Sequence, residues 1–147
     1  MTALTDALAQ YEADFAEFQQ ILAQYPASLR MQSGACGEWA PQQVVAHISG
    51  WLVEAKRRYA RFHTGTGQID YNIDAFNAVS VRIRKDYNWS HTVAELEKLG
   101  FELASLAKQV PAERAERDER YKKWLDIMAE EFRDHGAQLK AFQEQQA

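Results

Sequence analysis

Three residues, His47, Glu131 and His135, carry chemistry on helix faces that are otherwise apolar. A helix advances 100° per residue, which puts His47 at the edge of one apolar stripe and His135 near the middle of another. Glu131 precedes His135 by one turn, so both lie on one face of the same helix. Ionised carboxylates are rarely buried without a partner. The sequence therefore predicts that two imidazoles and one carboxylate point into the same core.

This trio has the composition of a transition-metal site. Two ligands at i and i+4 on one helix, joined by a third from a neighbouring helix, are a common arrangement in helical bundles. Three protein ligands leave a position open for water or substrate, and the donors suit Zn²⁺, Ni²⁺ or Fe²⁺. The alternative is a structural role, in which Glu131 pairs with His135 or another helix and the histidines are hydrogen-bonded core residues. Spacing alone favours the structural alternative.

The other reactive side chains are weaker candidates for a functional site. His63 and His91 fall at a helix end and a helix start, where solvated side chains are expected. Cys36 lies in a glycine-flanked loop, and as the single cysteine it cannot form an internal disulfide, which fits a reducing cytoplasm. Of the four tryptophans, Trp51 and Trp124 are expected in the core, whereas Trp39 and Trp89 precede helices and are placed to wall a pocket. The sequence has no glycine-rich phosphate loop, paired-cysteine metal motif or Gly-x-Ser-x-Gly elbow.

The elements that position these residues are helices. The 147 residues include 7 Gly and 3 Pro, too few for the many turns of a β-sandwich or barrel. Apolar stripes predict a first helix ending before Pro26, a second beginning at Pro41 and a last one from Tyr121 to Phe142. Between them, Asn72 is expected to cap a short helix, and Ser90 a longer one that ends at Pro111, with 112–120 either a linker or the start of the last helix.

Four amphipathic helices must bury their stripes on one another. The predicted fold is an all-α four-helix bundle, a single domain over residues 1–147. The joint between the second and third long helices, roughly residues 64–89, is long enough for a crossover instead of a tight hairpin. Simple up-down-up-down topology is therefore not required.

The net charge and its distribution along the chain indicate which binding partners to expect. The formal net charge is −4, but residues 56–85 carry seven basic and two acidic side chains, or +5. A basic segment of this kind would suit an anionic ligand or an acidic partner, but pairing with the acidic helices is the favoured interpretation. With a negative whole chain we expect no nucleic-acid partner. The sequence contains no apolar run long enough to span a membrane and no secretory signal, so we also expect no membrane partner.

The motifs resemble the DinB/YfiT-like four-helix-bundle superfamily, and within it the ClbS/DfsB-type branch. Residues 39–41 (Trp-Ala-Pro) and 45–48 (Val-Ala-His-Ile) are similar to the family's Trp-Ser-Pro…Leu-Ala-His-Leu entry to its second helix. Residues 71–78 (Tyr-Asn-Ile-Asp-Ala-Phe-Asn-Ala) are similar to the ClbS/DfsB-type branch, and 132–135 (Phe-Arg-Asp-His) look like the closing His-Tyr-Arg-Glu-His motif. The likeness runs over residues 5–142.

The resemblance implies a bundle with a crossover, frequently homodimeric, in which many relatives bind a divalent metal through three histidines. Some relatives are thiol-dependent transferases or isomerases, and the ClbS/DfsB-type branch is associated with protection against reactive, DNA-damaging metabolites. Carried over by position, the metal ligands and catalytic residues are His47, Glu131 and His135. Glu131 stands where the metal-binding pattern has a histidine, so a three-histidine site is excluded, but a mixed site is not.

Two functions follow as hypotheses. In the first, the chain is an enzyme, a metal-dependent hydrolase or a transferase using a low-molecular-weight thiol, that attacks an electrophilic small molecule. In a metal-free version, Glu131 is the general acid/base with a pKa raised by burial. In the second, the bundle binds and sequesters a small molecule without turnover. A third, weaker option is a dimeric scaffold without a site, in which the three side chains would not converge.

Overall fold

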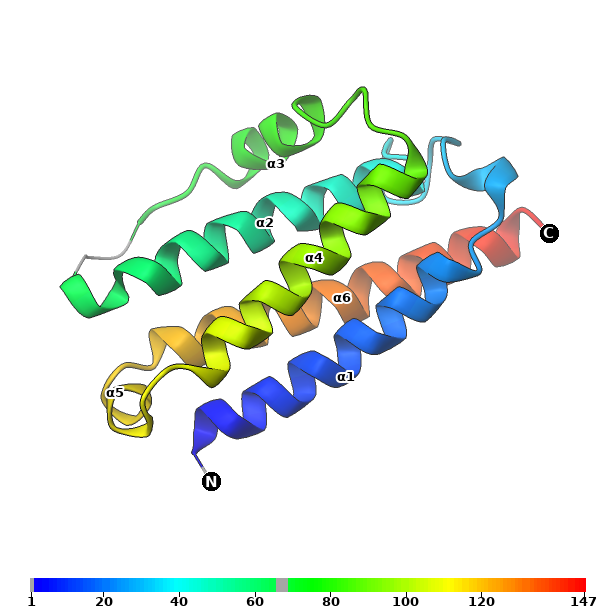
Figure 1. Ribbon diagram of the computed structural model, residues 1–147. Helices are drawn as coiled ribbons and strands as arrows, with labels where there is room; N and C mark the ends of the chain where they lie inside the picture. The colour runs from blue at the N-terminus through cyan, green and yellow to red at the C-terminus, as the bar shows by residue number, and fades with distance from the viewer. Residues whose placement is uncertain (1, 66–68) are drawn as a thin grey trace.

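The computed structural model describes residues 2–65 and 69–147, and these residues form six α-helices and no β-strand (Figure 1). The predicted all-α bundle is confirmed, whereas the extent of the domain over 1–147 stays a prediction. None of the helices in the described ranges is both long and apolar enough to cross a bilayer. The helices are α1 (Ala3–Ala23), α2 (Pro41–Arg61), α3 (Ile73–Arg82), α4 (Trp89–Lys108), α5 (Ala112–Arg117) and α6 (Arg120–Gln145).

The core is built from the predicted apolar stripes. On α1, the rings of Tyr11, Phe15 and Phe18 surround Phe132 of α6, with ring centroids 5.2–5.7 Å apart. All four side chains are almost completely buried. The Tyr11 hydroxyl donates to the carbonyl of Gly100 on α4 at 2.7 Å, so its one polar group is satisfied inside the core. This packing fixes α6, and with it the helix face that carries Glu131 and His135.

A crossover connection joins α2 to α4, as predicted from the length of the segment between them. The Gln42 side chain, at the start of α2, donates to the carbonyl of Tyr87, just before α4 begins. The two helices therefore start side by side and run in the same direction, and the bundle order is up-down-down-up (Figure 1). Within the predicted crossover, residues 66–68 lie outside the described residues.

Helix α3 lies along the outer side of α2 because Gly50 lets it approach (Figure 1). A Cβ atom at Gly50 would lie 2.1 Å from the hydroxyl oxygen of Ser80 on α3. No side chain larger than hydrogen fits there without moving α3. Asn72 caps α3 as predicted, its side-chain oxygen accepting from the backbone N–H of Ala75 at 3.1 Å. This cap fixes the start of α3, the helix that carries Asn77.

Two helix starts differ from the prediction. Asn88, and not Ser90, caps α4: its side-chain oxygen accepts from the backbone N–H of His91 at 2.8 Å. Ser90 falls inside the first turn, because the helix begins at Trp89. Residues 112–120 are neither a plain linker nor the start of α6, but form the separate helix α5 and a break at Asp118.

Candidate metal centre

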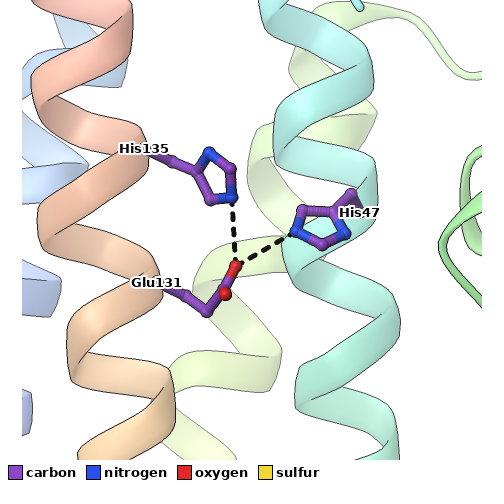
Figure 2. A group of neighbouring side chains, drawn as sticks. All are labelled: His47, Glu131 and His135. Carbon is purple, nitrogen blue, oxygen red and sulfur yellow. Dashed lines mark hydrogen bonds and ion pairs between the residues drawn. The ribbon is translucent and has the colours of Figure 1, made fainter. Parts of the chain in front are cut away.

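His47, Glu131 and His135 meet between α2 and α6 (Figure 2). Nε2 of His47 and Nε2 of His135 each lie 3.0 Å from the same carboxylate oxygen, Oε2 of Glu131. One potential ligand atom from each residue falls within 4.8 Å of the others. The predicted convergence is confirmed, and the separation of the three side chains that the scaffold hypothesis predicted is not found.

Burial and charge set the protonation of this cluster. Burial acts to raise the pKa of Glu131, but the hydrogen bonds and charges of His135 and His47 outweigh it and lower that pKa to about 2. Burial acts to lower the pKa of His135, and its contact with Glu131 reverses the sign, so the pKa of His135 is raised. The expected rise of the Glu131 pKa by burial is therefore wrong: Glu131 is held as a carboxylate, which leaves it unsuited to act as a general acid at neutral pH.

The outward-facing nitrogens of both imidazoles also have partners. Nδ1 of His47 lies 2.9 Å from Oδ1 of Asn77 on α3, and the indole N–H of Trp51 donates to that same oxygen at 2.7 Å. Nδ1 of His135 lies 2.7 Å from Oε1 of Gln138, one turn further along α6. Sequence reasoning assigned no role to Asn77, although it lies inside the motif at 71–78.

A mainly apolar cavity of about 280 Å³ opens beside the cluster. His47 and Glu131 form part of its wall, and α3 and the segment before it close one side. Trp51 and Trp124, expected in the core, are half-buried and line this cavity instead. The rest of the lining comes from Tyr71, Ile73, Asn77 and Ile127.

The rings in the cavity wall hold one another in place. The Trp51 ring stacks on Phe76 with centroids 4.1 Å apart and lies 5.2 Å from the Tyr71 ring. The Tyr71 hydroxyl donates to the buried carboxylate of Glu54 at 2.5 Å. The cavity therefore presents fixed aromatic faces next to the charged cluster.

The three residues fit a divalent metal by the chemistry of their donors. Two imidazole nitrogens, which are borderline donors, and a carboxylate oxygen, which is a hard donor, together suit Zn²⁺, Ni²⁺ or Fe²⁺. The donors already face one another, and each imidazole has its other nitrogen held by an outer amide, as in many metal sites. The cavity wall formed by His47 and Glu131 leaves room for a further ligand.

Except for Trp39, the remaining candidates lie apart from this cluster. His63 and His91 are exposed, as predicted. Cys36 is a half-buried free thiol in the loop before α2. Trp39 lies against His47, with ring centroids 5.1 Å apart, whereas Trp89 stacks on Tyr25 away from the cavity.

Part of the basic segment pairs with acidic residues of α4. Nζ of Lys56 lies 3.0 Å from Glu102, and Nε of Arg84 lies 2.7 Å from Glu95. The expected pairing of basic and acidic helices is confirmed for these residues. Arg82 and Lys85 are exposed on the crossover side of the bundle.

The fold and cluster define a class: four-helix bundles with a crossover and a histidine–carboxylate–histidine group between the second and last long helices. No family model and no curated protein matches the chain. A solved structure does: the colibactin self-resistance protein ClbS in complex with double-stranded DNA has a TM-score of 0.77 at 11% identity, over 94% of this chain and 93% of that chain. The resemblance to the ClbS-type branch is thus confirmed at the level of the fold.

One expectation about partners is corrected by this comparison. A net charge of −4 led us to exclude nucleic acid, but the similar structure, ClbS, was solved with double-stranded DNA bound. The exclusion was wrong because net charge averages over the whole surface, whereas nucleic acid is bound by a local basic face. The homodimer remains a prediction.

Proposed function

We propose that this chain is a metal-dependent enzyme that detoxifies an electrophilic small molecule, by hydrolysis or by transfer of a low-molecular-weight thiol. The single observation that carries the proposal is the convergence of His47, Glu131 and His135 at the wall of an apolar cavity. The similarity of fold to a self-resistance protein supports a protective role. The lone cysteine supports a reducing compartment such as the cytoplasm.

In this proposal His47, Glu131 and His135 are the metal ligands. A divalent metal held there would lower the pKa of a water or thiol at its open position, making a nucleophile near neutral pH. The carboxylate of Glu131, kept ionised by its histidine contacts, supplies the negative charge that balances the cation. The rings of Trp51 and Trp124 would hold the apolar part of the substrate and limit access of bulk water.

Metal binding is the first test. Titration calorimetry with Zn²⁺ and Ni²⁺, and with Fe²⁺ under anaerobic conditions, should give one ion per chain. Glu131→Ala and His135→Ala should lose this binding, whereas Glu130→Ala, an exposed neighbour on α6, should keep it. A wild-type chain that binds none of the three ions would overturn the metal-dependent mechanism.

Turnover is the second test and separates catalysis from sequestration. The metal-loaded protein is incubated with a panel of epoxides and activated esters, with and without a thiol such as cysteine. For a hydrolase, mass spectrometry should find the diol from an epoxide, or the acid and the released alcohol from an ester. For a transferase it should find the thiol adduct of the epoxide, or the thioester and the released alcohol from an ester. Probes that bind but are recovered unchanged would favour sequestration, and full activity in Glu131→Ala would contradict the proposed site.

A second candidate function is binding of duplex DNA, favoured by the ligand of the ClbS structure and by the +5 segment 56–85. Fluorescence anisotropy with a labelled duplex tests it, because phosphate contacts make affinity fall steeply with salt. The double variant Arg82→Ala/Lys85→Ala should weaken binding and flatten its salt dependence, whereas Lys122→Ala/Lys123→Ala on α6 should not. Absence of binding by the wild type at low salt would exclude this function.

A further inference from the structure

The side-chain amide oxygen of Asn77 contacts two side chains of α2. Oδ1 of Asn77 lies 2.7 Å from Nε1 of Trp51 and 2.9 Å from Nδ1 of His47. Trp51 and His47 are one helical turn apart, and Asn77 reaches them from α3. His47 is 5% exposed, so this contact lies out of bulk water.

The donors and acceptors of this contact can be assigned from chemistry. The indole nitrogen of Trp51 carries a hydrogen and can only donate, so the amide atom facing it must be the oxygen. The same oxygen faces His47, and an amide oxygen can only accept, so Nδ1 of His47 must carry the hydrogen. In the neutral imidazole, Nε2 is then the nitrogen with the free lone pair.

The free lone pair on Nε2 of His47 points toward the carboxylate of Glu131. Nε2 of His47 lies 3.0 Å from Oε2 of Glu131, which is itself an acceptor. Two acceptors at this distance need a cation or a proton between them. A metal ligand needs the same free lone pair on a neutral imidazole.

We propose that Asn77, oriented by Trp51, is a positioning residue that fixes His47 in the tautomer whose Nε2 is free to bind a metal. The inference rests on the proposed metal-dependent function. Trp51 is central because its N–H prevents the amide of Asn77 from turning its NH₂ group toward His47. His135 differs: its partner Gln138 is exposed, so its amide is not held in the same way.

The affinity for Zn²⁺ tests the role of the amide. Asn77→Leu removes the acceptor and should raise the Zn²⁺ Kd about 10- to 100-fold, the usual range for outer partners of a ligand histidine. Asn77→Asp restores an acceptor and should bring Kd back to within a few-fold of wild type. Trp51→Phe keeps the ring and frees the amide, and should give an intermediate loss, whereas Gln138→Ala should change Kd little.

The tautomer itself is measured without metal. Long-range ¹H–¹⁵N NMR spectra of chelator-treated protein at about pH 8.5 distinguish the two neutral imidazole tautomers, with His47→Gln to assign the signals. Wild type should show a hydrogen on Nδ1 of His47, whether or not Nε2 shares a proton with Glu131, and Asn77→Leu should lose this preference. A wild type whose His47 carries its only hydrogen on Nε2, with Nδ1 bare, would overturn the inference, and so would Asn77→Leu with unchanged tautomer and Kd.

The two readouts separate the two proposals. If wild type binds no metal but shows the Nδ1–H tautomer, the metal-dependent function fails while the assignment to Asn77 holds. If wild type binds metal with His47 in the opposite tautomer, the assignment to Asn77 fails while the function stands. Circular dichroism of each variant confirms that the helices are retained.

Discussion

Glu131 owes its chemistry to two neighbours instead of to its burial. The sequence places it on an apolar face, where a lone carboxyl has a raised pKa. In the folded chain two imidazoles reach one of its oxygens, and the pKa is lowered to about 2. A buried carboxyl with such partners is an anionic ligand and a poor proton donor at neutral pH.

The pKa shifts predict how the contribution of this cluster to the unfolding free energy of the metal-free protein depends on pH. A lowered pKa at Glu131 adds stability above the unfolded value of 4.5, and this is lost as the pH falls toward 2. A raised pKa at His135 adds stability below the unfolded value of 6.5, and this is lost as the pH rises through the folded pKa. The cluster should therefore stabilise the fold most at about pH 5–6.

Glu131→Gln measures this stabilisation. Urea unfolding with a chelator present should show a loss of roughly 1–3 kcal/mol at about pH 5.5 and a smaller loss at about pH 8.5. Glu130→Gln, at an exposed neighbour on the same helix, is the matched control and should change stability little at either pH. An equal loss at both pH values for Glu131→Gln would contradict the pairing with His135.

At the scale of elements, the N-terminus of α4 has two candidate capping residues, Asn88 and Ser90, and mutations can distinguish them. Asn88 accepts from the backbone N–H of His91, whereas Ser90 lies inside the first turn. Asn88→Ala should therefore cost about 1 kcal/mol of unfolding free energy, and Ser90→Ala should cost little, because alanine is a good helix former. Chemical denaturation of both variants checks this, and the reverse order would restore the sequence-based assignment.

Gly50 sets how closely α3 packs against α2, and therefore where Asn77 lies relative to His47. Gly50→Ala would push Ser80 away and shift α3, which carries Asn77. We expect the Zn²⁺ Kd to rise several-fold while the circular dichroism of the bundle is retained. The double variant Gly50→Ala/Ser80→Gly, which makes room for the added methyl group, should recover part of the affinity. Unchanged affinity in Gly50→Ala would show that α3 does not set the geometry of His47.

These elements also show what sequence can predict here. The shared face of Glu131 and His135 follows from helix periodicity, which one segment determines by itself. The role of Asn77 depends on where the crossover packs against α2, and that position is set by contacts between distant segments such as Gly50 and Ser80. Trp124 was expected in the core because periodicity identifies the inward face but not whether a cavity opens there.

At the scale of the whole molecule, metal binding and folding are linked if the site is a metal centre. An ion that binds the folded chain stabilises it by RT ln(1 + [L]/Kd), about 2.7 kcal/mol at 100 times Kd. Zn²⁺ should therefore raise the melting temperature of the wild type, and a chelator should reverse the shift. His47→Ala should show little of this shift, and an equal shift in that variant would place the bound ion elsewhere.

The two halves of the cluster lie 84 residues apart in sequence, on α2 and α6. Closing so long a stretch of chain costs entropy before the contact is made, so we expect the pair to form late in folding, after the long helices have packed. Contacts absent from the folding transition state change the rate of unfolding far more than the rate of refolding. A bound ion would therefore give this chain a longer native lifetime without helping it to fold.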